Sequence, residues 1–207
     1  MISGITGKLK FVFEEYVILS AGFMEIEVLI PEYTRRKLQP LKGEDISLFT
    51  IFYLDGNPAQ GRLTPKLIGF QSEFEREFFE LFCSVDGVGS KKALRAMVHP
   101  VEEVAFAIKE QDAKFLATLP GVGPATAERI IAKLRRKVSK FAILSPASGD
   151  FGENFSSENV GIFADAFQAL LVLGHSEAEA KKKIEKLTKS KKEFKTVQEV
   201  LNAIYAS

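Results

Sequence analysis

The sequence predicts an α+β multidomain protein with a small N-terminal β-barrel, a central helical domain carrying two helix-hairpin-helix motifs, and a small C-terminal three-helix bundle. Three observations support this prediction. Residues 1–70 consist of short β-rich runs separated by turn residues, at the spacing typical of small barrels. From Ser72 onward, apolar residues recur every three to four positions, which is the period of an amphipathic helix. A segment that contains Gly-Val-Gly occurs twice, 34 residues apart.

The N-terminal barrel is predicted from five β-rich runs. In the third run, Ile26, Val28 and Ile30 alternate with Glu25, Glu27 and Leu29, as in a strand with one face in a core. Residues 55–65 contain two glycines and two prolines, and we expect them to form a projecting loop without regular structure. The five runs are residues 2–13, 16–19, 23–30, 45–53 and 67–70.

The central and C-terminal regions are predicted to be helical. The first central helix has an apolar face made by Phe74, Phe78, Phe79, Leu81 and Phe82. Further helices are expected at residues 91–97, 101–109, 113–117 and 125–137, and after a Ser-, Gly- and Asn-rich stretch at 160–173, 176–189 and 196–206. The predicted domains are therefore 1–70 for the barrel, 71–140 for the helical domain, 141–159 for a flexible linker and 160–207 for the bundle.

The composition is that of a globular protein. Of the 207 residues, 46% are hydrophobic and 27% are charged, which argues against a disordered chain and against a membrane protein. No run approaches the roughly 18 apolar residues of a spanning helix, and the first ten residues lack the pattern of a secretory signal. We therefore expect a cytoplasmic protein that makes no membrane contact.

Metal and disulfide chemistry are not expected. Cys83 is the only cysteine, so an intrachain disulfide is excluded, and together with His99 and His175 it supplies too few ligands for a zinc site. Cys83 lies in the apolar run FFELFCSV, and we interpret it as a buried small hydrophobe rather than a nucleophile. No catalytic residue, metal or cofactor is predicted.

Positive charge is concentrated in the middle of the chain. The net charge of the whole chain is only +1, whereas residues 86–137 hold 10 basic and 6 acidic side chains. A local excess of this size is compatible with nucleic-acid binding, although a solvated helix face gives the same pattern.

The most specific feature is the repeat, in which SVDGVGSKKALRAM at 84–97 aligns with TLPGVGPATAERII at 118–131. Each copy has the pattern of a helix-hairpin-helix. Its glycines permit a tight turn and close approach to a ligand, and the amides at the start of the second helix attract a phosphate oxygen. A pair of such turns would hold the two strands of duplex DNA across a minor groove without reading its bases.

Two rival interpretations of the repeat fit less well. A period of 34 also matches tetratricopeptide repeats, and Gly-Val-Gly is found in nucleotide-binding loops. Both copies lack the third glycine of G-x-G-x-x-G, where Lys92 and Thr126 stand, and neither copy contains a phosphate-loop motif. A purely structural turn is the remaining alternative for each copy.

Over essentially its full length the chain resembles the RuvA family, the subunits of the bacterial branch-migration complex that recognise Holliday junctions. The resemblance rests on LIGF at 67–70 followed by EREFF at 75–79, DGVG at 86–89, LPGVG at 119–123 and TAER at 126–129. It implies that the barrel is an OB-fold and that the terminal bundle binds the hexameric motor RuvB. It also implies a homotetramer, or an octamer, around four-way junction DNA, with the RuvC resolvase as a further partner.

The repeat and the resemblance together assign the candidate site residues. DNA contacts are expected from Gly87, Val88, Gly89, Ser90, Lys91, Lys92, Gly121, Val122, Gly123, Pro124, Ala125, Thr126 and Arg129. The resemblance implies RuvB contacts at Leu170, Leu171, Leu173, Gly174 and Ala180, and an acidic pin at Asp55 that repels phosphates at the centre of the junction.

The chain departs from the family pattern at two of these places. The usual adjacent acidic pair of the pin is replaced by Leu54-Asp55-Gly56, so an ordinary turn aspartate is an equal alternative for Asp55. Pro124 and Ala125 stand where the family usually has lysines, which leaves the backbone amides, Lys91, Lys92 and Arg129 to contact phosphates.

The predicted function is a non-catalytic subunit that binds Holliday junctions and stimulates a partner ATPase in recombination and DNA repair. A helix-hairpin-helix glycosylase or lyase is the enzymatic alternative, which would need a base-flipping pocket beside a catalytic Lys or Asp. A general interaction module, whose turns only pack helices, is the third.

Overall fold

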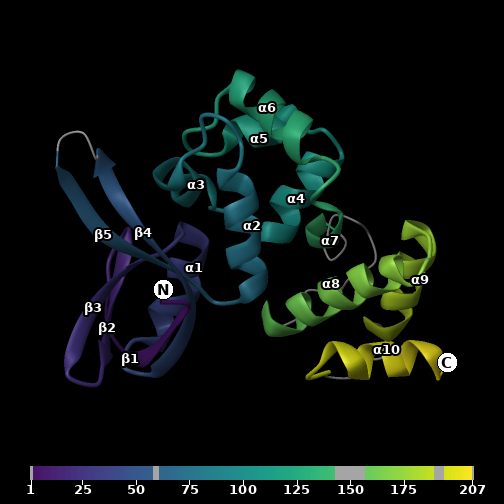
Figure 1. Ribbon diagram of the computed structural model, residues 1–207, viewed down its shortest axis with the longest axis horizontal. Helices are drawn as coiled ribbons and strands as arrows, with labels where there is room; N and C mark the ends of the chain where they lie inside the picture. The colour runs from purple at the N-terminus through teal and green to yellow at the C-terminus, as the bar shows by residue number, and fades with distance from the viewer. Residues whose placement is uncertain (1, 58–60, 143–156, 189–193, 207) are drawn as a thin grey trace. The chain divides into compact units, whose positions relative to one another are not determined.

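The computed structural model describes residues 2–57, 61–142, 157–188 and 194–206 (Figure 1). Its contacts group the chain into two compact units. The first unit contains Met1–Ser84, Val88–Val98 and Leu119–Gly121, and the second contains Val85–Gly87, His99–Thr118 and Val122–Ser207. Each repeated Gly-Val-Gly turn is therefore divided between the two units.

The first unit is built on a closed five-stranded barrel. Its strands are β1 (Gly4–Val12), β2 (Tyr16–Ala21), β3 (Met24–Leu29), β4 (Asp45–Asn57) and β5 (Arg62–Phe70). They close in the order β1-β2-β3-β5-β4, and β3 and β5 are parallel where Leu29 pairs with Ile68. This order is that of an OB-fold barrel, which confirms the predicted fold class.

The barrel interior follows from the alternation of side chains along each strand. Val17 and Leu19 of β2, Val28 of β3 and Leu9 of β1 are completely buried. Their neighbours in sequence point outward, as Glu27 does beside Val28. Of the apolar positions singled out by the period of two, Val28 and Ile30 lie in the core, and Ile26 is partly buried against it.

The β4–β5 connection differs from the prediction. The sequence predicts no regular structure for residues 55–65, but the ladder between β4 and β5 continues from Phe49↔Phe70 to Asn57↔Arg62. Pro65 is accommodated opposite Leu54, because the pairing of β5 with β3 occurs further along the strand, at Ile68. A strand edge that needs no donor tolerates proline. The two strands form an arm that projects from the barrel (Figure 1); residues 58–60 lie outside the described residues.

A short helix between β3 and β4 was not predicted. Helix α1 (Glu32–Leu38) is followed by a 3₁₀ turn, η1 (Gln39–Leu41). Only Thr34 and Leu38 of α1 are buried, so the helix offers no apolar period for sequence reading to detect. Pro31 before it, Glu32 in its first turn and basic residues in its last turn are nevertheless typical helix signals.

After the barrel, the first unit continues with helices α2 (Glu73–Cys83) and α3 (Ser90–Ala96). The Ser72 side chain accepts a hydrogen bond from the Glu75 amide and so caps α2. The predicted phenylalanine face is buried, and each such side chain contributes about 1.5–3 kcal/mol through burial. Cys83 at the end of α2 is partly buried, and burial raises its pKa to about 12.

The second unit is helical in the described residues. Its helices are α4 (Val101–Lys109), α5 (Ala113–Thr118), α6 (Pro124–Leu134), α7 (Ser139–Ala142), α8 (Ser157–Val172), α9 (Glu177–Thr188) and α10 (Val197–Tyr205). The helix predicted at 125–137 ends at Leu134. Phe163, Phe167, Ile184 and Val200 form the centre of the three-helix bundle α8–α10.

The predicted linker is only partly covered by the described residues. Residues 143–156 lie outside them, and α8 begins at Ser157, within the segment expected to be linker. The predicted domain boundaries therefore remain a prediction. In the part of the chain that the structure describes, no helix is long and apolar enough to cross a membrane.

Candidate nucleic-acid interface

The two Gly-Val-Gly turns have the same backbone conformation. The first glycine of each turn is left-handed, with φ of 83° at Gly87 and 78° at Gly121. The last glycine is extended, with φ and ψ of −85° and 171° at Gly89 and of −91° and 172° at Gly123. Only glycine adopts the first conformation without strain. The sequence repeat is therefore a repeat of structure as well.

Buried side chains hold each turn in place and leave its backbone exposed. Val88 and Val122, between the glycines, are 2% and 4% exposed, whereas the glycines on both sides of them are exposed. As expected from their positions, Val88 and Val122 offer only main-chain groups to a ligand. Thr126 is also buried, at 7%, and its amide donates to the Gly123 oxygen, so its predicted DNA contact remains a prediction.

The amides of the helices that follow the turns are suited to bind an anion. Gly89 and Gly123 precede α3 and α6, and neither has a side chain that caps the first-turn amides. The first amides of a helix have no partner within it and carry the positive end of the helix dipole. Pro124 occupies the first helical position of α6, where its missing N–H removes no helical hydrogen bond.

A basic side chain lies beside each left-handed glycine. A Cβ atom on Gly87 would lie 3.2 Å from Nη1 of Arg129, and a Cβ atom on Gly121 would lie 3.4 Å from Cγ of Lys92. In both cases the cation belongs to the helix that follows the other turn. Main-chain amides and basic side chains are the groups that bind a phosphate diester.

Arg129 also braces the first turn. Its Nη1 donates to the main-chain oxygen of Asp86 at 3.4 Å, and Nε donates to the oxygen of Ala125 at 3.1 Å. Lys133 adds an ion pair with the Asp86 carboxylate at 3.3 Å. Sequence patterns could not indicate the contact between Asp86 and Lys133, because it joins residues 47 positions apart.

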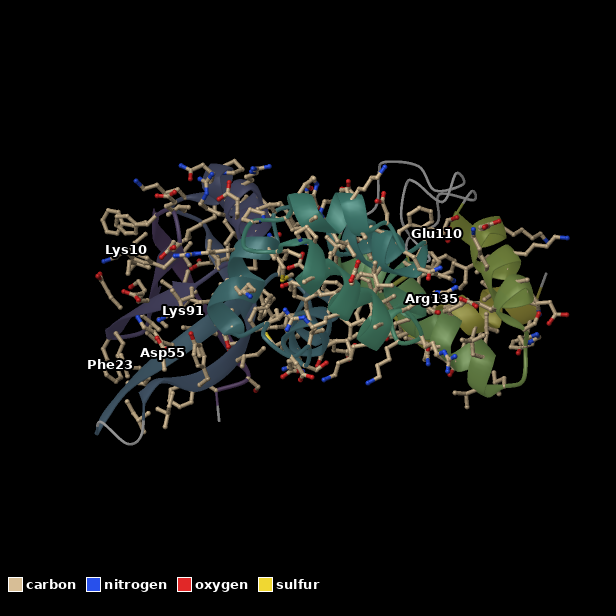
Figure 2. All side chains as sticks on the ribbon, turned by 90° about the horizontal axis from the view of Figure 1, so that it is seen from above. Lys10, Phe23, Asp55, Lys91, Glu110 and Arg135 are labelled. Carbon is tan, nitrogen blue, oxygen red and sulfur yellow. The ribbon has the colours of Figure 1, made fainter. Side chains whose placement is uncertain are left out.

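Lys91 and Asp55, both predicted site residues, form an ion pair. The Lys91 Nζ atom lies 3.0 Å from Oδ2 of Asp55, and Figure 2 shows the two side chains next to each other. The hydrogen bond to Asp55 raises the pKa of Lys91. Asp55 lies within β4 opposite Thr64 instead of in the expected irregular loop, and its side chain is 32% exposed.

A second pair of the same kind lies one turn further along α3. Arg95 is 3.6 Å from Glu15, which lies between β1 and β2. Sequence analysis did not include Arg95, although it is the counterpart of Arg129 in the repeat. Lys91 and Arg95 are four residues apart, so they lie on one face of α3.

These two pairs border a cleft of about 740 Å³ within the first unit. Its charged lining consists of Glu14, Glu15, Glu32, Asp55, Lys66, Lys91 and Arg95. Tyr53 also lines it, and its hydroxyl is buried without a hydrogen-bond partner. Burial, followed by the charge of Asp55, raises the pKa of Tyr53, so this hydroxyl stays protonated.

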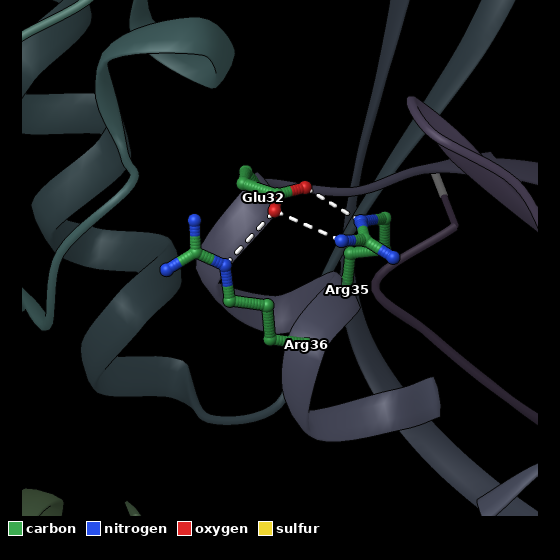
Figure 3. A network of polar contacts seen from close by, with 3 residues as sticks. All are labelled: Glu32, Arg35 and Arg36. Atoms are coloured by element: carbon green, nitrogen blue, oxygen red, sulfur yellow. Dashed lines mark hydrogen bonds and ion pairs between the residues drawn. The ribbon is translucent and has the colours of Figure 1, made fainter. Parts of the chain in front are cut away.

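Glu32 is held on the edge of this cleft by two arginines of its own helix (Figure 3). Its carboxylate accepts from Arg35 Nε at 2.6 Å and from Arg36 Nε at 2.9 Å. The hydrogen bond to Arg35 is the main cause that lowers the pKa of Glu32 to about 2. Glu32 is therefore ionised at neutral pH, and the positive charges of Arg35 and Arg36 balance its negative charge.

The residues predicted to bind a partner protein are not all at the surface. Leu170 and Ala180 are completely buried in the bundle, so their side chains offer no surface here, and the partner contacts predicted for them remain a prediction. Leu171 is half-buried, and Leu173 and Gly174 are exposed. Val172, the last residue of α8, was not predicted but is 82% exposed. Apolar character alone does not distinguish core from surface on a helix that is apolar on most sides.

In the described residues, no group of three His, Cys, Asp or Glu side chains could hold a metal ion.

Comparison with known proteins places both regions in described families. The model for the RuvA N terminal domain matches residues 1–56, and the model for the SAM-like helix-hairpin-helix tandem matches residues 79–136. The second match covers both Gly-Val-Gly turns and confirms the tandem of helix-hairpin-helix motifs.

Similar proteins match most or nearly all of the chain. The protein from Rhodopirellula baltica is 51% identical over 99% of this chain and 98% of its own length. The one from Desulfatibacillum aliphaticivorans is 33% identical over 99% and 98%, and the one from Caldanaerobacter subterraneus subsp. tengcongensis is 33% identical over 87% of each. All three are named Holliday junction branch migration complex subunit RuvA, which does not favour the glycosylase alternative.

Proposed function

Because this chain belongs to the RuvA family of Holliday junction branch migration complex subunits, we propose that it binds four-way junction DNA and holds it for branch migration. The observation that carries the proposal is the pair of exposed turns that share one backbone conformation, with a basic side chain beside the left-handed glycine of each. Such turns contact the sugar-phosphate backbone, so the junction is recognised by its geometry and not by its base sequence.

We propose that the chain itself is not an enzyme and that its role depends on partners. A RuvB-type hexameric ATPase would supply the motion, and the exposed apolar end of α8 is the surface we assign to it. A RuvC-type resolvase is a further proposed partner, and no cofactor is required. The proposed location is the cytoplasm, where bacterial chromosomal DNA lies.

We further propose a homotetramer as the DNA-binding form, with an octamer as the alternative. Each chain offers only two weak phosphate contacts, and four copies around a four-armed junction would multiply them. The arm supports this proposal, because Phe52, Leu54 and Leu63 are 39%, 54% and 44% exposed, and alternation along the ladder puts them on one face. A second copy would cover these side chains. Sedimentation of Leu54→Asp should show a smaller assembly than the wild type.

Gel-shift titration of a four-way junction and of linear duplex at several salt concentrations tests the function. We expect tighter binding to the junction, with an affinity that falls as salt rises. Gly87→Val and Gly121→Val should bind weakly, because valine is strained at positive φ and its side chain covers the turn.

Gly43→Val is the matched control, because Gly43 has a φ of 96° and open space around its Cβ position, and it belongs to neither turn. It should lose comparable stability and keep its DNA affinity. Equal binding to junction and duplex would favour the interaction module. Base release or strand cleavage by the chain alone would favour the glycosylase or lyase.

A further inference from the structure

The carboxylate at position 55 is held in a fixed place by the arm. Asp55 lies in the β4–β5 ladder opposite Thr64, with further paired positions on both sides of it. Its side chain is 32% exposed, and in the same strand the hydroxyl of Tyr53 is buried. The short side chain of an aspartate in such a ladder has little freedom to move.

The cation that pairs with it is exposed and lies in the helix that follows the first turn. Lys91 is the second residue of α3, and its side chain is 75% exposed. A lysine has a flexible four-carbon stem and a compact charge that forms hydrogen bonds in several directions. The ammonium group can therefore meet Asp55, as it does here at 3.0 Å, or a phosphate bound at the α3 amides.

These two contacts compete for one ammonium group. In the protein without DNA, the charge of Asp55 is balanced by Lys91. When Lys91 moves to a phosphate, the Asp55 carboxylate loses its partner while the arm keeps it in place. The pair thus links phosphate binding at the turn to the appearance of an uncompensated negative charge on the arm.

We propose that Lys91 is an exchange cation, which neutralises Asp55 in the free protein and releases it by moving to a DNA phosphate. This inference rests on the proposed function, since it requires that the first turn binds phosphate. It makes Asp55 a positioning residue that lowers DNA affinity through Lys91. A carboxylate that only repelled DNA directly would not need Lys91.

A double-mutant cycle separates the two mechanisms. Junction affinity is measured by gel shift for the wild type, Asp55→Asn, Lys91→Gln and the double variant. Asp55→Asn should bind the junction roughly two- to five-fold more tightly than the wild type, the range for breaking one exposed ion pair. In the Lys91→Gln background, Asp55→Asn should raise the junction affinity by less than it does in the wild type.

Glu25→Gln is the matched control. It removes one carboxylate of the same barrel, whose partner is Lys10, and changes the net charge by the same amount. Glu25→Gln should leave the junction affinity at the wild-type level. Thermal unfolding of each variant shows that the fold is retained.

The outcomes separate this inference from the proposed function. If Asp55→Asn raises junction affinity equally with and without Lys91, or raises it in neither background, the exchange is overturned. The proposed function still stands in that case, provided that the wild type prefers junctions. Failure of the wild type to prefer junctions over duplex overturns both. A gain that requires Lys91, alongside wild-type junction preference, supports both.

Discussion

Nη1 of Arg129 in α6 lies 3.4 Å from the main-chain oxygen of Asp86, directly before the left-handed glycine of the first turn. The same guanidinium group contacts Thr126 Oγ1 at 3.4 Å. Arg95 holds the equivalent position in the first copy of the repeat, yet it pairs with Glu15. Two arginines that are equivalent in sequence therefore have different tasks, and Arg129 alone of the two supports a turn.

This difference predicts unequal effects of removing the two arginines. Arg129→Ala should weaken junction binding by about ten-fold, the scale of a lost hydrogen bond to a charged group, because the first turn loses its brace and a cation. Arg95→Ala should have a smaller effect. Gel-shift titrations at one salt concentration measure both, and equal losses would show that the arginines act only through their charge.

Glu32 predicts a stability that depends on pH. Its pKa is about 2 in the fold and 4.5 as the ordinary value, because Arg35 donates a hydrogen bond to its charged form. A lowered pKa stabilises the fold above about pH 4.5, and the contribution is lost as the pH falls toward 2. Glu32→Gln should therefore unfold with a free energy about 1 kcal/mol below that of the wild type at pH 7.

The difference between Glu32→Gln and the wild type should shrink as the pH falls below about 4.5. Urea unfolding followed by circular dichroism at several pH values measures it. Glu27→Gln, which breaks the exposed pair with Lys66, is the control and should destabilise less at pH 7. A constant difference from pH 7 to pH 3 would contradict the role of the Glu32–Arg35 pair.

Cys83 is predicted to react slowly with thiol reagents. Burial, and then the nearby charge of Glu80, raise its pKa from 9.0 to about 12, so its thiolate fraction at pH 8 is about 1000-fold smaller than that of an exposed cysteine. Iodoacetamide alkylation of Cys83 should therefore be much slower in the native protein than in urea. Ser84→Cys in a Cys83→Ser background places a thiol at the adjacent exposed position and should react quickly. Similar rates for the two variants would contradict the burial of Cys83.

Much of the fold could be predicted because local patterns determine it. Alternation in β3 marks Val28 as a core residue, and the spacing of Phe74 and Phe78 marks the buried face of α2. The turns could be predicted because Gly87 and Gly121 need a conformation that other residues avoid. These features depend on neighbours within a few positions along the chain.

The features that sequence reading missed depend on distant parts of the chain. The ladder from Leu54↔Pro65 to Asn57↔Arg62 forms despite glycines and prolines that disfavour strands, because pairing across the arm satisfies the backbone. Asp55 and Lys91 could each be selected, but their pairing across 36 positions is a property of the fold. Leu170 and Val172 show the same limit, since only packing reveals that the first is buried and the second exposed.

The exposed apolar end of α8 is the surface that we assign to the motor protein, and a charge placed there tests this assignment. Val172 and Leu173 are 82% and 60% exposed, and Val172→Asp places a charge on this apolar surface without disturbing the bundle core. It should abolish stimulation of RuvB ATP hydrolysis while junction binding stays at the wild-type level. Gln168→Asp, at an exposed position on the same helix, is the matched control and should stimulate normally. Leu170→Ala would instead destabilise the bundle by about 2–5 kcal/mol, so it cannot test the surface. Undiminished stimulation by Val172→Asp would move the motor-binding surface away from this end of α8.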